Sequence, residues 1–308
     1  MRPRHALAAL GLLAALGNAI VAAHAWRFTH FVDAGTKTAN PEELTLADRL
    51  QVVLTGVVVP RPTVRRQPED VGLTARHVQQ ATVSTWVIDG DGRGTALLFH
   101  GYGGVKSDLL DEARVLHDAG WTTVLVDFPG SGGSPGSVTS LGWQEAEIVA
   151  ALAGRHRKGG PLALVGKSMG SAAVLRAVGE LGAEADALVL ENPFDRLVTT
   201  VGHRFEALGL PGRPGADLLV FWGGLELGFD GFAMDPVAFA AHVRVPTLLL
   251  HGAEDPRVRL DEVESIGAAL AGPHELVPFP QAAHVGLYGA DPDRWRDAVD
   301  SFLDRWAP

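Results

Sequence analysis

From residue 83 onward, short apolar runs alternate with segments in which apolar residues recur at helical spacing. The runs are continuously apolar, as expected of strands buried on both faces of a sheet. They lie at 83–88, 95–99, 121–126, 162–165, 187–190, 245–250 and 276–279. The last helical segment carries four large apolar residues on one face: Trp295, Val299, Phe302 and Leu303. This alternation predicts an α/β fold with a mostly parallel sheet and helices on both faces. In such sheets the chemistry lies beyond the carboxyl ends of the strands.

The first apolar segment is of a different kind. Residues 6–23 carry no charge and follow Arg2 and Arg4, and a helix of this length is near the minimum that spans a bilayer. Aromatic residues follow where a membrane interface would lie: Trp26, Phe28 and Phe31. The pattern predicts an N-terminal signal anchor, a transmembrane helix within residues 1–31. The preceding charges favour an extracytoplasmic location for the rest of the chain, although Arg27 and Lys37 weaken that inference.

The same segment has an alternative interpretation. Ala23-His24-Ala25 has the small-x-small form of a signal-peptidase site, so the mature protein is alternatively secreted or periplasmic after cleavage. We favour the uncleaved anchor, because the apolar run is long for a signal peptide and is followed by interfacial aromatics.

Residues 32–82 have mixed composition and separate the anchor from the regular alternation. Prolines punctuate them, and the leucines of 44–54 could cover an apolar surface, so we interpret 32–82 as a linker and docking segment. Residues 83–308 form the α/β domain. Within this domain the alternation of strands and helices is interrupted at residues 192–244. The interruption is too long for a simple connection, so we predict an insertion of short helices there.

Composition narrows the classes of function. Acidic residues outnumber Lys plus Arg by 36 to 26, and the basic residues are scattered, so we expect no nucleic-acid partner. The chain has no cysteine, which excludes disulfides, thiolate chemistry and cysteine zinc sites.

One strand candidate runs directly into a turn that is typical of a nucleophile. Residues 162–170 read LALVGKSMG, and a helical pattern follows. In a strand-turn-helix setting, GxSxG is the nucleophile elbow, whose glycines allow a tight bend that exposes Ser168. The overlapping Gly-Lys-Ser also resembles the end of a phosphate-binding loop. That motif requires a glycine at the position of Pro161 and a loop where the pattern indicates a strand, so we reject it.

An activated serine requires a base and a carboxylate that orients it. His284 follows the run ending at Phe279, and Asp255 follows the run 245–250, which gives the chain order Ser, Asp, His. Glu254 and Asp195 remain competing acids. His274 is set aside, because it precedes its strand and would lie at the wrong edge of the sheet.

The tetrahedral intermediate of acyl transfer needs backbone N–H donors. The Gly-rich turn HGYGG closes the run 95–99 and places the amide of Tyr102 near the serine, while Met169 supplies the amide after the nucleophile. These two amides are the expected oxyanion hole. We interpret a second Gly-rich loop, DFPGSGG at 127–133, as part of the site rim.

Taken together, HGYGG, DFPGSGGSPG, GKSMG, HGAEDPRV and PQAAHVG resemble the α/β-hydrolase superfamily in spacing and order across residues 83–308. Within it the chain is similar to membrane-anchored Bem46-like and serine-aminopeptidase-like α/β hydrolases. The resemblance implies an eight-stranded sheet whose second strand is antiparallel, and it implies acyl-enzyme chemistry. It also implies Ser168, Asp255 and His284 as the triad, with Tyr102 and Met169 as oxyanion donors. The insertion 192–244 corresponds to a short helical cap.

The expected function is hydrolysis of a carboxylic ester or thioester, with a small-molecule acyl substrate and no metal or organic cofactor. The apolar insertion is expected to roof the site and hold an apolar acyl group. A serine aminopeptidase is the alternative, for which Glu226 and Asp230 are the candidate acids that would hold a terminal amine. Two further alternatives stay open: an acyltransferase that uses the same triad, and a catalytically silent membrane-tethered binding protein.

Overall fold

The computed structural model describes residues 3–157 and 160–308, and for residues 3, 4, 6–10, 13 and 14 it describes only the backbone. The chain forms two compact units. We call Arg61–Arg196 with Met234–Pro308 the sheet unit, and Met1–Pro60 with Leu197–Ala233 the helical unit. The N-terminal segment is thus grouped with the middle of the chain. The sequence pattern does not indicate this grouping, and the boundaries expected at residues 31 and 82 stay predictions.

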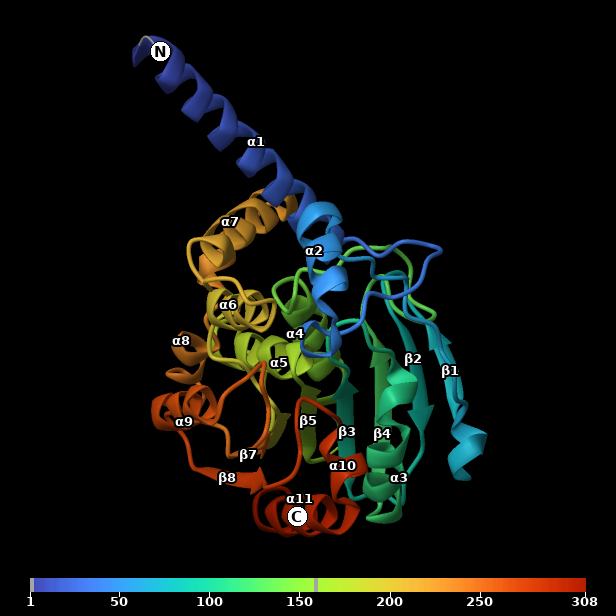
Figure 1. The fold of residues 1–308 in the computed structure, drawn as a ribbon. Helices are drawn as coiled ribbons and strands as arrows, with labels where there is room; N and C mark the ends of the chain where they lie inside the picture. The colour runs from blue at the N-terminus through green and yellow to red at the C-terminus, as the bar shows by residue number, and fades with distance from the viewer. Residues whose placement is uncertain (1–2, 158–159) are drawn as a thin grey trace. The chain divides into compact units, whose positions relative to one another are not determined.

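The sheet unit is built on one eight-stranded sheet in the order β1-β2-β4-β3-β5-β6-β7-β8 (Figure 1). Its strands are β1 (Arg76–Gln79), β2 (Ser84–Ile88), β3 (Gly94–Phe99), β4 (Trp121–Asp127), β5 (Leu162–Lys167), β6 (Ala187–Glu191), β7 (Thr247–Gly252) and β8 (His274–Phe279). β2 runs antiparallel to both of its neighbours, and every other pair is parallel. This arrangement confirms the expected mixed, mostly parallel sheet and its antiparallel second strand.

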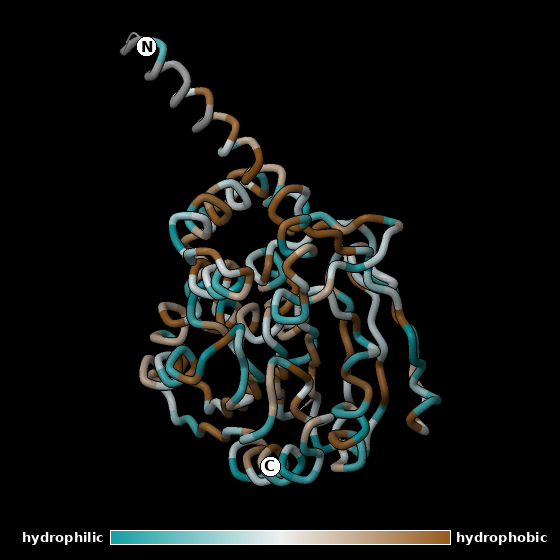
Figure 2. The backbone as a smooth tube through the Cα atoms, viewed as in Figure 1, coloured by the Kyte–Doolittle hydropathy of each residue, from teal (hydrophilic) through white to brown (hydrophobic). Residues whose placement is uncertain are grey.

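Helices complete the sheet unit: α3 (Leu110–Asp118), α4 (Glu145–His156), α5 (Met169–Gly179), α8 (Pro236–Ala240), α9 (Leu260–Ala269), α10 (Leu287–Ala290) and α11 (Pro292–Trp306), with 3-10 turns η2 (Pro68–Val71) and η3 (Lys106–Leu109). The central strands are largely apolar, as the brown stretches in Figure 2 show, and residues 96–99 of β3 are fully buried. α3 and α11 pack on the same core cluster, and α11 buries the four apolar residues that its spacing predicts.

Strand register determines which loops meet. Lys167 pairs with Glu191, Glu191 pairs with Leu250, and Gly252 pairs with Phe279. The chain segments that leave β5, β6, β7 and β8 therefore emerge side by side at the carboxyl edge of the sheet.

The helical unit consists of α1 (Pro3–Thr29), α2 (Leu46–Thr55), α6 (Leu197–Ala207) and α7 (Gly215–Leu227), with 3-10 turns η1 (Pro41–Glu43) and η5 (Gly231–Ala233). α1 and α7 pack closely because a small residue of each helix lies at the crossing. A Cβ on Gly223 would lie 3.9 Å from that of buried Ala25. Beside this contact, the indole N–H of Trp222 donates to Asn18 over 3.3 Å. A capping box of Thr45 and Asp48 begins α2.

Within the residues that the structure describes, none of the helices is both long enough and apolar enough to cross a bilayer. α1 contains the span expected at 6–23, but the side chains of residues 6–10, 13 and 14 lie outside the description. The transmembrane anchor therefore stays a prediction.

Candidate active site

Ser168 lies at a sharp turn between β5 and α5, at the carboxyl edge of the sheet. Its backbone has φ +51°, which a residue with a Cβ rarely adopts. The flanking glycines are required sterically, because a Cβ on Gly166 would lie 2.6 Å from the amide nitrogen of Ser171. A Cβ on Gly170 would lie 2.4 Å from the carbonyl oxygen of Phe99. This strained strand-turn-helix geometry is the one that the GxSxG motif predicts.

The structure brings the three residues expected as a triad into one line of hydrogen bonds. The Oγ of Ser168 lies 3.1 Å from Nε2 of His284, and Nδ1 of His284 lies 2.6 Å from Oδ2 of Asp255. Asp255 is in the loop after β7, and His284 is in the loop after β8. With Nδ1 protonated, Nε2 is free to accept the serine proton.

The carboxylate is held in its ionised form. Its Oδ1 accepts from the amides of Arg257 and Val258 over 2.8 and 3.0 Å, which leaves Oδ2 for His284. Burial by itself would raise the pKa of Asp255, but the hydrogen bond and charge of His284 and the two amides together hold the pKa below its usual value. Asp255 is thus an anion that can orient an imidazolium and compensate its charge.

The competing residues are placed differently from Asp255, which is the acid bonded to His284. The side chain of Asp195 pairs with the Arg196 guanidinium over 2.9 Å, and Glu254 is exposed. His274 is exposed at the first residue of β8, at the opposite edge of the sheet.

The two expected oxyanion donors lie on segments that border Ser168. Met169 is the first residue of α5, where backbone amides have no partner within the helix. The Gly-rich turn approaches from β3, since a Cβ on Gly101 would lie 3.5 Å from that of Ser168, and Tyr102 is the next residue. The oxyanion role of the two amides stays a prediction.

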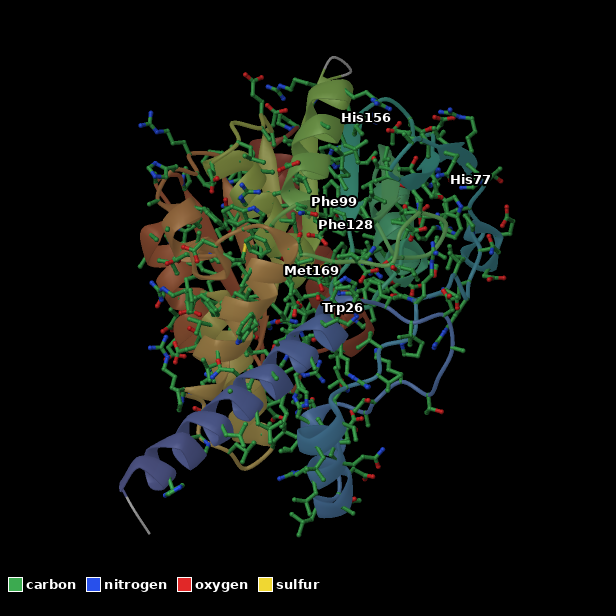
Figure 3. All side chains as sticks on the ribbon, turned by 90° about the horizontal axis from the view of Figure 1, so that it is seen from above. Trp26, His77, Phe99, Phe128, His156 and Met169 are labelled. Carbon is green, nitrogen blue, oxygen red and sulfur yellow. The ribbon has the colours of Figure 1, made fainter. Side chains whose placement is uncertain are left out.

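His100 shapes this turn, although the sequence pattern did not single it out. The buried ring donates from Nδ1 to the carbonyl of Gly101 over 2.8 Å, and its Nε2 accepts from the amide of Phe128 over 3.0 Å. Burial lowers the pKa of His100, so the ring is neutral and keeps this tautomer. The His100 ring meets the edge of the Phe128 ring with centroids 5.1 Å apart, and Phe128 stacks on Phe99 over 5.7 Å. Figure 3 labels the two phenylalanines. The sequence signal that could have identified His100 is its place directly after a buried strand, where polar residues often have a functional or structural role.

The loop at 127–133 is organised by a buried ion pair. Asp127 accepts from Nζ of Lys106 over 2.5 Å and from the amide of Gly133 over 2.9 Å, and both charged side chains are almost fully buried. The carboxylate therefore fixes the loop from inside.

In residues 3–157 and 160–308, no group of three or more His, Asp or Glu residues is arranged to hold a metal ion.

The insertion that was expected to cap the site contributes α6 and α7 to the helical unit. Its role as a roof over Ser168 stays a prediction.

Known proteins share this architecture. Residues 90–212 match the family model described as serine aminopeptidase, S33. The chain is 26% identical over 219 residues to protein YqkD of Bacillus subtilis, which covers 68% of this chain and 71% of that protein.

Esterases are among the similar solved structures. That of Pyrococcus furiosus esterase Pf2001 superposes with a TM-score of 0.64 and 21% identity, covering 81% of this chain and 99% of that one. The esterase EaEST of Exiguobacterium antarcticum gives a TM-score of 0.52 and 16% identity, covering 75% and 100%. The chain thus has the α/β-hydrolase fold, and its residues 90–212 resemble the serine aminopeptidase S33 family.

Proposed function

We propose that this protein is a serine hydrolase that cleaves a carboxylic ester or thioester through an acyl-enzyme intermediate. The observation that carries the proposal is the continuous line of hydrogen bonds from Ser168 through His284 to buried Asp255. The elbow supports it, because a strained serine has no evident purpose in a protein that does no chemistry. This argues against the catalytically silent binding protein.

The proposed reaction proceeds in two halves. The Oγ of Ser168 attacks the acyl carbon while Nε2 of His284 takes its proton, and the amides of Tyr102 and Met169 stabilise the oxyanion. Collapse breaks the bond to the leaving oxygen or sulfur, which takes the proton from His284. Water then gives a proton to His284 and attacks the acyl carbon. The acid departs, and Ser168 recovers its proton.

The apolar composition of the insertion favours a substrate with an apolar acyl group. Peptide-bond hydrolysis is the second candidate, and the match of residues 90–212 to the serine aminopeptidase model favours it. Its candidate acids are poorly prepared to bind an amine. Burial raises the pKa of Glu226, which disfavours the anion, and Asp230 accepts from the backbone amide of Phe232 over 3.0 Å.

A panel of substrates tests the proposal directly. We expect the full chain to hydrolyse p-nitrophenyl esters in a series from acetate to palmitate, and Ser168→Ala to abolish turnover. Aminoacyl-nitroanilides are the competing panel. Preference for nitroanilides would favour the peptidase. A folded wild type that is silent on both panels and unlabelled by a fluorophosphonate would contradict the hydrolase.

We also propose that the helical unit binds a lipid bilayer, with the sheet unit on the extracytoplasmic side. α1 and α2 expose many large apolar side chains: Leu12, Leu16, Ile20, Trp26, Leu46, Leu50 and Leu54. The sequence before Asp33 carries Arg2, Arg4 and Arg27 but no acid, which suits anionic headgroups. Flotation of the full chain with anionic vesicles and protease protection in spheroplasts test the two parts. A mature N-terminus at Trp26 would contradict the uncleaved anchor.

A further inference from the structure

The end of β6 lies between the strand that carries the serine and the strand that precedes the aspartate. Glu191 is its last residue and pairs in register with Lys167 on one side and Leu250 on the other. The carbonyl oxygen of Glu191 accepts from the amide of Ser168 over 2.7 Å and from the Oγ of Ser171 over 3.0 Å. The elbow is therefore fastened to the last residue of β6.

Asn192 follows Glu191 and extends these contacts to the two other loops of the proposed triad. Its side-chain oxygen accepts from the amide of Gly252, three residues before Asp255, over 2.9 Å. Its side-chain nitrogen donates to the carbonyl of Val285, next to His284, over 3.2 Å. The residue is almost fully buried and has φ +45°, a conformation that asparagine tolerates better than most residues. An amide side chain suits this position, because its oxygen can accept from one segment while its nitrogen donates to the other.

The carboxylate of Glu191 secures the segment just after His284. Its two oxygens accept from the indole N–H of Trp295 over 2.7 Å and from the amide of Leu287 over 3.3 Å. The side chain of Lys167, the residue before the nucleophile, extends toward the carboxyl group of Glu191. Its ammonium pairs with buried Glu112 over 2.5 Å and lies 3.9 Å from Glu191.

These charges hold one another in place. Burial by itself would lower the pKa of Lys167, but Glu112 and Glu191 raise it well above its ordinary value, so the side chain is an ammonium. Lys167, whose side chain is largely buried, and Glu112 hold each other in place, because loss of either partner would leave the other charge uncompensated.

We infer that Asn192 is a positioning residue, which acts with Glu191 to set the distance between Ser168 and His284 by bonding to the loops of Ser168, Asp255 and His284 together. The inference rests on the proposed function, since positioning matters only if the serine and the histidine react. Asn192 contacts neither reacting side chain. It acts through the backbone of Gly252 and Val285.

Misplacing a reacting group by about 1 Å can cost on the order of 100-fold in rate. Loss of Asn192 should therefore lower kcat much more than it changes KM. Partial unfolding would also lower the apparent kcat, so kcat is compared at a temperature well below the Tm of every variant.

The chain offers a matched control at the other end of the same strand. Asp186 precedes β6, is partly buried, and accepts from the amide of Leu162 over 2.8 Å and from Arg157. It fixes a loop as Asn192 does, but at the edge of the sheet far from Ser168.

The experiment compares Asn192→Gly, Asn192→Asp and Asp186→Ala in the full chain, with p-nitrophenyl butyrate as substrate and thermal unfolding as the measure of stability. Glycine removes both contacts without backbone strain, and aspartate keeps the acceptor but loses the donor. We expect Asn192→Gly to lower kcat at least about tenfold with KM within about twofold, and Asn192→Asp to lower kcat as well. Asp186→Ala should lower Tm but keep kcat. Wild-type kcat in folded Asn192→Gly, or equal losses of kcat in Asp186→Ala, would overturn the inference.

A second measurement does not depend on turnover. The Nδ1 proton of His284, bonded to Asp255, gives a low-field proton resonance that is assigned by its absence in His284→Ala. We expect it to weaken or disappear in Asn192→Gly and to persist in Asp186→Ala. If the wild type hydrolyses no ester, the proposed function fails while this measurement still decides the positioning role. An unchanged resonance in Asn192→Gly would contradict that role.

Discussion

The two units of the chain treat their apolar residues differently. In the sheet unit the large apolar side chains are packed inside, and the exposed ones are Leu181, Leu260, Val285 and Trp306. In the helical unit α2 buries none of its residues, all of which are described, and it exposes Leu46, Leu50, Val53 and Leu54. The sheet unit therefore buries nearly all of its large apolar side chains within its own core, as the hydrophobic effect favours. The apolar surface of the helical unit is why we assign lipid to this unit and chemistry to the other.

The largest expected effect concerns the serine itself. We expect Ser168→Ala to lower kcat by roughly 1,000-fold or more, because no other group on the line to His284 can form the acyl-enzyme. Steady-state ester hydrolysis measures the loss. Exposed Ser265, whose Oγ donates to the carbonyl of Asp261, gives the control variant Ser265→Ala, which should keep full activity. Equal activity in Ser168→Ala and wild type would contradict the proposal that Ser168 is the nucleophile.

The next effect contrasts two glycines of the sheet unit. A Cβ on Gly170 would lie 2.4 Å from the carbonyl of Phe99, whereas a Cβ on Gly154 in α4 would meet nothing within 4 Å. We expect Gly170→Ala to destabilise the protein by about 3 kcal/mol or more. Gly154→Ala should stabilise it by about 0.5–1 kcal/mol. Urea unfolding measures both. Equal free energies of unfolding for Gly170→Ala and Gly154→Ala would show that the elbow can accommodate a Cβ at residue 170, which would contradict the packing described.

A smaller effect concerns two buried carboxyls at the same sheet edge, Asp255 and Glu191. Their contributions to stability should change with pH in opposite directions. The pKa of Asp255 is lowered by His284 and backbone amides, so its contribution to stability is present above its unfolded pKa of about 3.9 and is lost as pH falls through the lower folded pKa. The pKa of Glu191 is raised by burial, so its contribution is present below its unfolded pKa of about 4.3 and is lost as pH rises through the higher folded pKa.

Calorimetry across this range on Asp255→Asn and Glu191→Gln tests the contrast. Relative to its variant, the wild type should gain stability with rising pH in the first comparison and lose it in the second. Slopes of the same sign would show that one of the two carboxyls is not in the ionic state described.

The smallest effect on stability is expected in the helical unit. Leu50→Ser with Leu54→Ser should change the free energy of unfolding by no more than about 0.5 kcal/mol, because both side chains are exposed. The same pair should weaken binding to anionic vesicles, as flotation measures. As a matched pair in the sheet unit, exposed Leu181→Ser should leave flotation unchanged. Undiminished vesicle binding by the double variant would remove α2 from the lipid-binding surface.

The sheet and the three proposed triad residues could be predicted because their signals are local. The strands β3 to β7 are mainly apolar runs, GxSxG marks the elbow, and Asp255 and His284 follow their strands in the expected order. β1 is an exception, because it reads RHVQ, is mostly exposed and lies within the segment expected as a linker. The contacts of Asn192 could not be predicted in this way. They join segments 60 and 93 residues apart, and nothing near Asn192 in the sequence indicates either partner. The packing of α1 on α7 is equally hidden, because Ala25 and Gly223 become neighbours only in the folded unit.

Labelling with a fluorophosphonate, followed by peptide mass spectrometry, shows directly whether Ser168 is an activated nucleophile. We expect one adduct per folded chain, on Ser168. We also expect no adduct in Ser168→Ala and slower labelling in His284→Ala, which lacks the base 3.1 Å from the serine oxygen. An adduct on another residue, or a folded wild type that is never labelled, would contradict the claim that Ser168 is an activated nucleophile.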